Sequence, residues 1–238
     1  MMSNPAPIAV ALDAPNLGAL QDWAGLVAPW VSTLKVGLEV FCRDGDLSVS
    51  GARAAASSAG VKGIEIFLDL KLHDIPATVA GAARAVAHLE PAILTVHAAG
   101  GAAMVEAAAL ALPNTRIAAV TVLTSLDEQA LAAIGMIGPS IDAAVRLAVL
   151  ATNAGARAVV CSPREVAAIR AAVSPEITLI TPGVRPPGSS VNDQKRVATP
   201  AQAMADGSDL LVIGRPITAA ADVARAAQEI ALSIVDVS

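Results

Sequence analysis

The feature that most constrains the fold is a regular alternation of short apolar runs, rich in β-branched residues, with longer helical runs rich in Ala and Leu. The predicted strands lie at residues 8–13, 33–38, 65–72, 93–98, 116–123, 158–162, 178–184 and 210–214. Strands that alternate with helices form parallel sheets. Eight such units in 238 residues predict α/β architecture as one closed (β/α)8 TIM barrel, a single domain over residues 1–238. A doubly wound sheet would carry a Gly-rich fingerprint after its first strand, where this chain has APNLG.

The composition excludes some kinds of partner. Hydrophobic residues make up 55% of the chain, but aromatic residues make up only 2% and Tyr is absent, so the core must consist of aliphatic side chains. Few aromatic side chains also means few platforms for stacking nucleic-acid bases. The net charge of −5 opposes non-specific attraction to phosphate backbones. We therefore expect no nucleic-acid partner, although a small anionic ligand remains compatible with local positive charge.

The chain carries no visible targeting or membrane segment. Its start, MMSNPAPIAVALDAPNL, lacks a basic region, and the apolar run there ends at Asp13. No apolar run approaches the roughly 18 residues that a membrane span needs. Cys42 and Cys161 lie far apart without a paired motif and are expected to be small buried hydrophobes in a reducing compartment. We therefore expect a cytoplasmic protein with no membrane association.

The barrel prediction also locates the chemistry, because barrel enzymes react at the C-terminal ends of their strands. Polar or conformationally special residues occur at nearly every predicted strand end. These residues are Asp13, Asp69, Lys71, His97, Thr124, Pro182, Arg185, Gly214 and Arg215. Lys35 lies earlier in its own strand. The sequence thus predicts one polar site at a single end of the barrel.

The third predicted strand, FLDLKLHDIP, contains ionisable residues within an apolar run. Side chains alternate along a strand, so Asp69 and Lys71 share the inward face while Leu68, Leu70 and Leu72 face the helices. Buried opposite charges must be paired, either as a purely structural ion pair or as part of a site. Asp74 follows the strand and Pro76 suits the first position of a helix. Alone, Asp74 is typical of a turn residue near a helix N-terminus, and Thr78 is typical of a first helical turn.

Two later segments suit an anion. In VIGRPIT, Gly214 permits close backbone approach, Arg215 offers a bidentate fork, and Pro216 can begin a helix whose N–H groups face a phosphate. The end of the eighth strand is also a common phosphate site in barrels. The segment TPGVRPPGSSVNDQKRVATP is rich in Pro, Gly and Ser, which fits either a flexible loop or a lid that closes over the ligand.

The run FLDLKLHDIPATV resembles the signature Asp-x-Lys-x-x-Asp-Ile-Pro-x-Thr of the orotidine 5′-phosphate decarboxylase family, with Ala77 at a free position. Other motifs of the bacterial form occur in the family's order over the whole chain. They are VALD at 10–13, LKVG at 34–37, VLTSL at 122–126, TPGVRP at 181–186, DQKR at 193–196 and VIGRPIT at 212–218. The resemblance implies conversion of orotidine 5′-monophosphate to uridine 5′-monophosphate and CO2 in de novo pyrimidine biosynthesis. It also implies a homodimer that uses neither a metal nor an organic cofactor.

The same resemblance assigns catalytic roles. Lys71 is implied as the proton donor and cationic stabiliser of a carbanion-like intermediate, with Asp69 beside the substrate carboxylate. Lys35, Asp69, Lys71 and Asp74 would form an array of alternating charge, whose neighbouring carboxylates favour the charged form of Lys71. Asp74 and Thr78 would reach across the dimer interface into the neighbouring subunit's site.

The remaining substrate contacts implied by the resemblance divide by the part of the nucleotide they hold. Asp13 and Lys35 would contact the ribose, and Thr124 the pyrimidine, with Ser125 as the alternative if the register differs by one. Gln194 is implied to contact the phosphate and Arg185 to belong to the binding set, beside Gly214 and Arg215 of the anion site described above. His73 and His97 could be site residues, but a His at a strand end is often only a satisfied polar residue.

Other activities on the same barrel remain open at this point. A Mg²⁺-dependent sugar-phosphate decarboxylase or hexulose-phosphate synthase shares Asp-x-Lys-x-x-Asp, but continues with Ala-Gly where this chain has Ile-Pro-x-Thr. A Schiff-base aldolase would use Lys71 as a nucleophile, which flanking carboxylates disfavour because they keep the amine protonated. A catalytically inactive barrel that only binds nucleotides would be expected to have lost part of the charged array.

Overall fold

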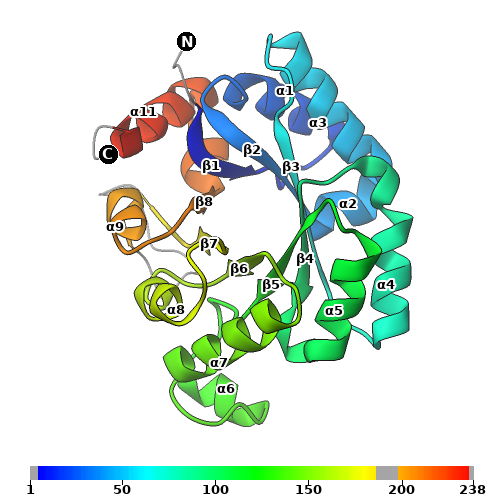
Figure 1. The fold of residues 1–238 in the computed structure, drawn as a ribbon. Helices are drawn as coiled ribbons and strands as arrows, with labels where there is room; N and C mark the ends of the chain where they lie inside the picture. The colour runs from blue at the N-terminus through cyan, green and yellow to red at the C-terminus, as the bar shows by residue number, and fades with distance from the viewer. Residues whose placement is uncertain (1–4, 186–197, 236–238) are drawn as a thin grey trace.

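The computed structural model of the chain describes residues 5–185 and 198–235. Within these residues, eight parallel strands pair in sequence order and close into a barrel, which confirms the predicted fold class (Figure 1). The strands are β1 Ala6–Ala11, β2 Val31–Gly37, β3 Glu65–Leu72, β4 Ile93–His97, β5 Arg116–Val120, β6 Ala158–Val160, β7 Thr178–Pro182 and β8 Leu210–Ile213. Every strand except β3 ends earlier than predicted, because the residues that follow belong to loops or, after β2 and β4, to the first turn of a helix.

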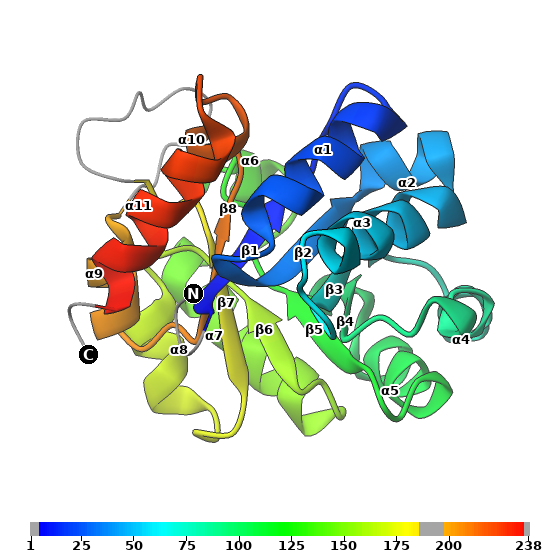
Figure 2. The same ribbon diagram turned by 90° about the horizontal axis from the view of Figure 1, so that it is seen from above.

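Helices surround the strands on all sides (Figures 1 and 2). They are α1 Leu17–Val27, α2 Leu38–Asp44, α3 Asp46–Ser58, α4 Pro76–Ala85, α5 Ala102–Ala111, α6 Glu128–Ala133, α7 Ser140–Asn153, α8 Val166–Ala172, α9 Pro200–Ala205, α10 Arg215–Thr218 and α11 Val223–Val235, with 3-10 turns η1 Ala87–Leu89 and η2 Ala98–Gly100. Pro76 occupies the first turn of α4, as predicted. Asn16 caps α1, with its side-chain oxygen accepting from the Ala19 amide at 2.9 Å. None of the helices in the described part of the chain is long and apolar enough to cross a membrane.

The core has two layers separated by the barrel wall. Outward-facing strand residues such as Leu34 and Leu68 pack against the surrounding helices. The barrel interior is filled by Ala9, Phe67, Ile93, Ala118, Val120, Ala158, Val160, Ile180 and Leu210. Apart from Phe67, these side chains are aliphatic, as the composition predicted. Lys35 and Asp69 lie further along β2 and β3, so a charged layer covers the apolar interior at the C-terminal end of the barrel.

One prediction about the cysteines is wrong. Both are free, and Cys161 is buried as expected, but Cys42 is exposed. Cys42 lies in α2, where its neighbour Phe41 packs against the core instead. Adjacent residues of a helix point in different directions, so a helix that buries Phe41 leaves Cys42 in solvent.

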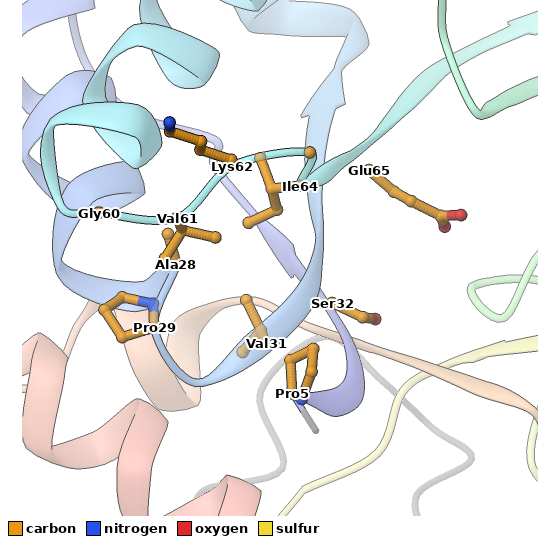
Figure 3. Close-up of a pocket in the computed structure, with 11 residues that line it drawn as sticks. Pro5, Ala28, Pro29, Val31, Ser32, Gly60, Val61, Lys62, Ile64 and Glu65 are labelled. Atoms are coloured by element: carbon orange, nitrogen blue, oxygen red, sulfur yellow. The ribbon is translucent and has the colours of Figure 1, made fainter. Parts of the chain in front are cut away.

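The opposite, N-terminal end of the barrel has a cavity of about 490 Å³ (Figure 3). It is lined by Pro5, Ala28, Pro29, Val31, Ser32, Gly60, Val61, Lys62, Gly63, Ile64 and Glu65. The side chain of Glu65 points away from the apolar groups in Figure 3, and its carboxylate pairs with Arg116. This cavity therefore brings together no pair of catalytic groups, in contrast to the charged layer at the other end.

Candidate active site

Four charged side chains form a continuous array at the C-terminal end of the barrel. Nζ of Lys71 lies 2.7 Å from Oδ1 of Asp69. Nζ of Lys35 lies 3.3 Å from Oδ2 of Asp69 and 3.6 Å from Oδ1 of Asp13. Lys35 and Asp69 are only 7% and 8% exposed, so these charges are held largely away from water. The predicted pairing of Asp69 with Lys71 is confirmed, and the order of charges along the array is Asp13, Lys35, Asp69, Lys71.

An irregularity in β3 places Lys71. The pairing of β3 with β4 shifts register between Leu68, opposite Leu94, and Leu72, opposite Val96. The intervening stretch of β3 is longer than its partner and bulges, which re-aims a side chain in the way β-bulges do near active sites. Lys71 adopts a φ of +50° there, a left-handed conformation that is costly for a side chain with a Cβ. Strain of this kind persists only where surrounding contacts hold it.

Thr95 in β4 supplies those contacts, and the sequence reasoning missed it. Its Oγ1 accepts a hydrogen bond from the Lys71 amide at 2.8 Å and donates one to Oδ1 of Asp69 at 2.9 Å. The side chain is fully buried. A signal was available, because Thr95 lies two residues from Ile93, which is part of the barrel interior, and therefore shares its inward face.

The environment of Asp69 keeps its carboxylate ionised. Burial disfavours the charge, but the ammonium groups of Lys35 and Lys71 and the hydrogen bonds from Lys71 and Thr95 together outweigh burial and lower the pKa of Asp69. The carboxylate therefore acts as a fixed negative charge between two cations. Removing it would leave the Lys71 ammonium without its carboxylate partner, and the buried Lys35 ammonium with only Asp13, 3.6 Å away.

Gly37, at the end of β2, makes room for the outer half of the array. A Cβ at this position would lie 2.5 Å from Oδ1 of Asp13 and 3.0 Å from Nζ of Lys35. The sequence motif LKVG contained this glycine, but only its position beside Asp13 in space shows why a side chain is excluded.

Two adjoining cavities open beside the array and share Asp69, Pro182 and Val212. The smaller, about 160 Å³, is mostly apolar and is lined by Phe67, Asp69, Lys71, Val120, Val122, Leu123, Thr124, Val160, Cys161, Pro182 and Val212. The larger, about 500 Å³, is more polar and is lined by Ala11, Asp13, Lys35, Asp69, Pro182, Gly183, Val184, Arg185, Val212, Gly214, Arg215 and Pro216. The carboxylate of Asp69 thus lies where an apolar chamber meets a polar one.

The cavities bring together most of the predicted binding residues. Thr124 lines the smaller cavity, whereas its alternative Ser125 is exposed. The larger cavity collects Asp13, Lys35, Arg185, Gly214 and Arg215. Arg185 is only 7% exposed, and its amide donates to the carbonyl of Ala198 at 3.0 Å. Gln194, which was predicted to contact phosphate, lies outside the described residues.

Asp74 and Thr78 do not join the array of their own chain. Both are exposed at the start of α4. Oδ1 of Asp74 accepts from the amide of Ile75 at 2.6 Å, so within one chain it behaves as the turn residue that its local sequence suggests. Their predicted role in a neighbouring subunit's site is not tested by a single chain and stays a prediction.

His73 and His97 form a pair beside β3 and β4. Their ring centroids lie 5.4 Å apart with the rings tilted. Partial burial lowers the pKa of His97, and the charges of His73 and Lys71 lower it further, while Asp69 acts in the opposite direction. His97 is therefore favoured as a neutral ring near the array. Among the described residues, no group of three or more His, Cys, Asp or Glu side chains is placed to hold a metal ion.

Comparisons with known proteins agree with this geometry. The model of the orotidine 5′-phosphate decarboxylase / HUMPS family matches residues 6–230. Orotidine 5′-phosphate decarboxylase of Thermobifida fusca (strain YX) is 64% identical over 229 residues, which cover 96% of each chain. The Frankia casuarinae protein of the same name is 55% identical and covers 96% of this chain and 88% of its own. The crystal structure of the Lactobacillus acidophilus protein of that name superposes with a TM-score of 0.81 at 33% identity, covering 96% of this chain and 99% of the other.

Proposed function

The chain belongs to the orotidine 5′-phosphate decarboxylase / HUMPS family, and on this premise we propose how its residues divide the work of the reaction. The activity is that of its curated relatives, the conversion of orotidine 5′-monophosphate to uridine 5′-monophosphate and CO2. One observation carries the proposal, which is the position of the Asp13–Lys35–Asp69–Lys71 array between an apolar and a polar cavity. A nucleotide has the same two halves, a flat ring and a hydrophilic ribose phosphate.

The pyrimidine ring is assigned to the smaller cavity. Thr124 there offers a hydroxyl to the polar edge of the ring, and apolar side chains such as Val122 and Val160 contact its faces. The ring carboxylate would then project toward Asp69 and Lys71, which line the same cavity. Because the cavity is mostly apolar, it excludes water that would otherwise compete for the proton.

The ribose phosphate is assigned to the larger cavity. Asp13 and Lys35 can bond the ribose hydroxyls, since one accepts and the other donates hydrogen bonds. Arg185 and Arg215 face the same space and suit a phosphate dianion, for which guanidinium groups are bidentate donors. Gly214 allows the phosphate to approach the backbone. Gln194 remains the proposed phosphate contact from the segment beyond Arg185.

In the chemical step, the bond between the ring carbon and the carboxylate breaks and CO2 departs. The electron pair of that bond stays on the ring carbon as a carbanion-like centre. The Lys71 ammonium stabilises the developing negative charge and then donates a proton to the same carbon, giving the product. Asp69 holds the ammonium at this carbon with both carboxylate oxygens. The protein thus supplies the charge stabilisation that a cofactor would otherwise provide as an electron sink.

The active unit is proposed to be a cytoplasmic homodimer in which Asp74 and Thr78 complete the partner's site. Support comes from their exposure at the start of α4 and from Ile75 between them, whose large apolar side chain is 65% exposed. An apolar side chain beside polar ones would suit an interface, which has an apolar centre and a polar rim. The free state of both cysteines fits a reducing cytoplasm.

A direct assay tests the proposed function. Purified protein is expected to change the absorbance of orotidine 5′-monophosphate as the substrate is consumed, and Lys71→Ala is expected to abolish turnover. An unchanged absorbance with the wild-type protein refutes the assignment, and full activity in Lys71→Ala refutes the role of Lys71. Activity that disappears in EDTA supports a Mg²⁺-dependent sugar-phosphate enzyme instead, and trapping of substrate by borohydride supports a Schiff base.

A further inference from the structure

We propose that Thr95 is a positioning residue for the decarboxylation, because one hydroxyl fixes both the backbone of Lys71 and the carboxylate of Asp69. The inference rests on the proposed function and extends it to a residue outside the family signature in β3. Thr95 does not line either cavity, so it acts through its two partners and not by touching the substrate.

The first partner is the backbone of Lys71. The register of β3 against β4 skips from Leu68 to Leu72, so the amide of Lys71 lies in the bulge and outside the regular ladder. The amide donates instead to Oγ1 of Thr95 at 2.8 Å. A buried amide without an acceptor is costly. Thr95 therefore replaces the missing strand partner and holds Lys71 in its left-handed conformation, with a φ of +50°.

The second partner is the carboxylate of Asp69, and the chemistry of the hydroxyl fixes the direction of that bond. A threonine hydroxyl has one proton and two lone pairs. Because the Lys71 amide has no lone pair to offer, Oγ1 must accept from it, and the hydroxyl proton is free to point at Oδ1 of Asp69, 2.9 Å away. Oδ1 accepts this proton together with a Lys71 ammonium proton, and both bonds are stronger when Asp69 is ionised.

Thr95 therefore couples the position of the proton donor to the charge of its counter-ion. Without the hydroxyl, the Lys71 amide loses its acceptor and the bulge loses the contact that holds its strained residue. The same change removes a donor that lowers the pKa of Asp69. Loss of the hydroxyl therefore displaces the Lys71 ammonium and makes the Asp69 carboxylate easier to protonate. Both effects lower turnover, and both leave the nucleotide-binding residues in place.

Two other buried threonines, Thr115 and Thr121, differ from Thr95. Within the described residues, the Thr115 hydroxyl donates to the carbonyl of Pro91 and the Thr121 hydroxyl to that of Val160. Each of these holds one backbone group and no ionisable residue. Thr115 immediately precedes β5, at the end of the barrel away from the array, and makes a matched control.

The experiment compares Thr95→Val, which keeps the shape but removes the hydroxyl, with Thr95→Ser and with Thr115→Val. The substrate is orotidine 5′-monophosphate, and kcat, KM and the affinity for uridine 5′-monophosphate are measured across pH. Thr95→Val is expected to lower kcat by about 10- to 100-fold, since small displacements of a reacting group have effects of this size. Product affinity should stay within a few-fold of wild type, and the acidic limb of the kcat profile should move to higher pH. Thr95→Ser should have the kcat and the acidic limb of wild type. Thr115→Val should also leave both quantities unchanged.

Thr95→Cys keeps the test valid if the valine variant does not fold. A thiol is similar in size to the hydroxyl but is a weaker donor, so the acidic limb of the kcat profile should again move to higher pH, by a smaller amount. The proposal is overturned if a folded Thr95→Val or Thr95→Cys has the kcat and pH profile of wild type, or if the serine variant fails to restore them. A wild-type protein without decarboxylase activity refutes the proposed function itself, so the two failures are distinguishable.

Discussion

Nζ of Lys71 lies 2.7 Å from Oδ1 and 2.8 Å from Oδ2 of Asp69, so a single carboxylate holds the ammonium with both oxygens. Oδ2 also faces Nζ of Lys35 at 3.3 Å. Asp69 is therefore the shared counter-ion of the buried Lys35 and the partly exposed Lys71, and the array depends on it more than on either lysine. This dependence can be measured both as stability and as turnover.

Asp69→Asn is expected to destabilise the fold and to reduce turnover strongly. The amide has nearly the shape of the carboxylate, but it leaves the Lys71 ammonium without its counter-ion and the buried Lys35 ammonium with Asp13 alone, 3.6 Å away. Breaking a buried ion pair from one side typically costs about 3–5 kcal/mol, and the remaining solvent access reduces this toward the lower end. The free energy of unfolding in urea and kcat for orotidine 5′-monophosphate are the two measurements.

A matched control is Glu229→Gln, which removes a carboxylate from the exposed pair of Arg225 and Glu229 in α11. Exposed pairs of this kind contribute little to stability. The control should leave both unfolding and turnover nearly unchanged. Equal effects of the two substitutions would show that Asp69 is not the counter-ion on which the array depends.

The contribution of Asp69 to stability should depend on pH with a defined sign. Its pKa is lowered in the folded protein, mainly by Lys35 and Lys71 acting against the opposing effect of burial. The stabilisation is therefore complete when the pH is above the pKa of Asp in the unfolded protein, about 3.9. It is lost as the pH falls through the pKa of Asp69 in the folded protein. The difference in unfolding free energy between wild type and Asp69→Asn should be constant near neutrality and should narrow in acid. A difference that grows on acidification contradicts this origin.

His88 offers a pH control of opposite sign. Its hydrogen bond with Asp46 raises the pKa of the imidazole. His88 therefore stabilises the fold when the pH is below the pKa of His in the unfolded protein, about 6.5. This stabilisation is lost as the pH rises through the pKa of His88 in the folded protein. His88→Gln should therefore differ from wild type more at pH 5 than at pH 9, although only slightly because the pair is exposed. An effect that is largest in alkali would show that the Asp46 contact does not operate in solution.

Periodicity in the sequence predicted the barrel and the inward pair of Asp69 and Lys71, because a two-residue period depends only on local pattern. It could not predict the bulge at Lys71, since regular alternation treats every strand as flat and the register shift arises from pairing with β4. Periodicity could place Thr95 on the inward face, but it could not show the role of its hydroxyl. Its importance depends on lying opposite a bulge, and not on the residues next to it in the chain.

The larger geometry of the site depends on closure of the barrel. Asp13 lies next to Lys35 because β1 and β2 pair. No local sequence pattern could predict the 3.6 Å between Oδ1 of Asp13 and Nζ of Lys35. The two cavities likewise combine residues from opposite sides of the ring. The places of Asp74 and Thr78 in a partner's site come from resemblance alone, because a single chain shows them exposed.

Gly37→Ala should disturb the charged array without unfolding the barrel. A Cβ there would lie 2.5 Å from Oδ1 of Asp13, closer than real contacts allow, so the Asp13 side chain must turn away and release Lys35. The backbone itself is not strained, with a φ of −88° at Gly37. We expect a folded protein with a KM raised about 10-fold or more. The ribose would lose its hydrogen bond to the positioned Asp13 carboxylate, and a hydrogen bond to a charged group contributes about 1.5–3 kcal/mol.

The control for this variant is Gly25→Ala in α1, where the nearest atom to a new Cβ is the carbonyl oxygen of Ala55 at an ordinary 3.6 Å. An alanine in a helix interior is favourable, so this variant should keep full activity and be equally or more stable. If Gly37→Ala has the KM of wild type, Asp13 does not need its present position to hold the substrate.

Mixing two inactive variants tests whether Asp74 serves the partner's site. Lys71→Ala and Asp74→Asn are each expected to be inactive as homodimers. In a mixed dimer, the site that contains Lys71 from the Asp74→Asn chain receives Asp74 from the Lys71→Ala chain, so this site is complete. The other site lacks both groups. Random reassortment makes about half of the dimers mixed, so activity should recover to about a quarter of wild type. The measurement is turnover after the two variants are unfolded and refolded together.

The control mixes Lys71→Ala with Asp69→Asn, whose altered residues belong to the same site of the same chain. Every site in these mixed dimers lacks one of the two groups, so no activity should return. Recovery in the first mixture and none in the second assigns Asp74 to the partner. If neither mixture recovers while the refolded wild type does, Asp74 acts within its own chain, which requires the turn at Asp74 to change the conformation in which it accepts from the Ile75 amide.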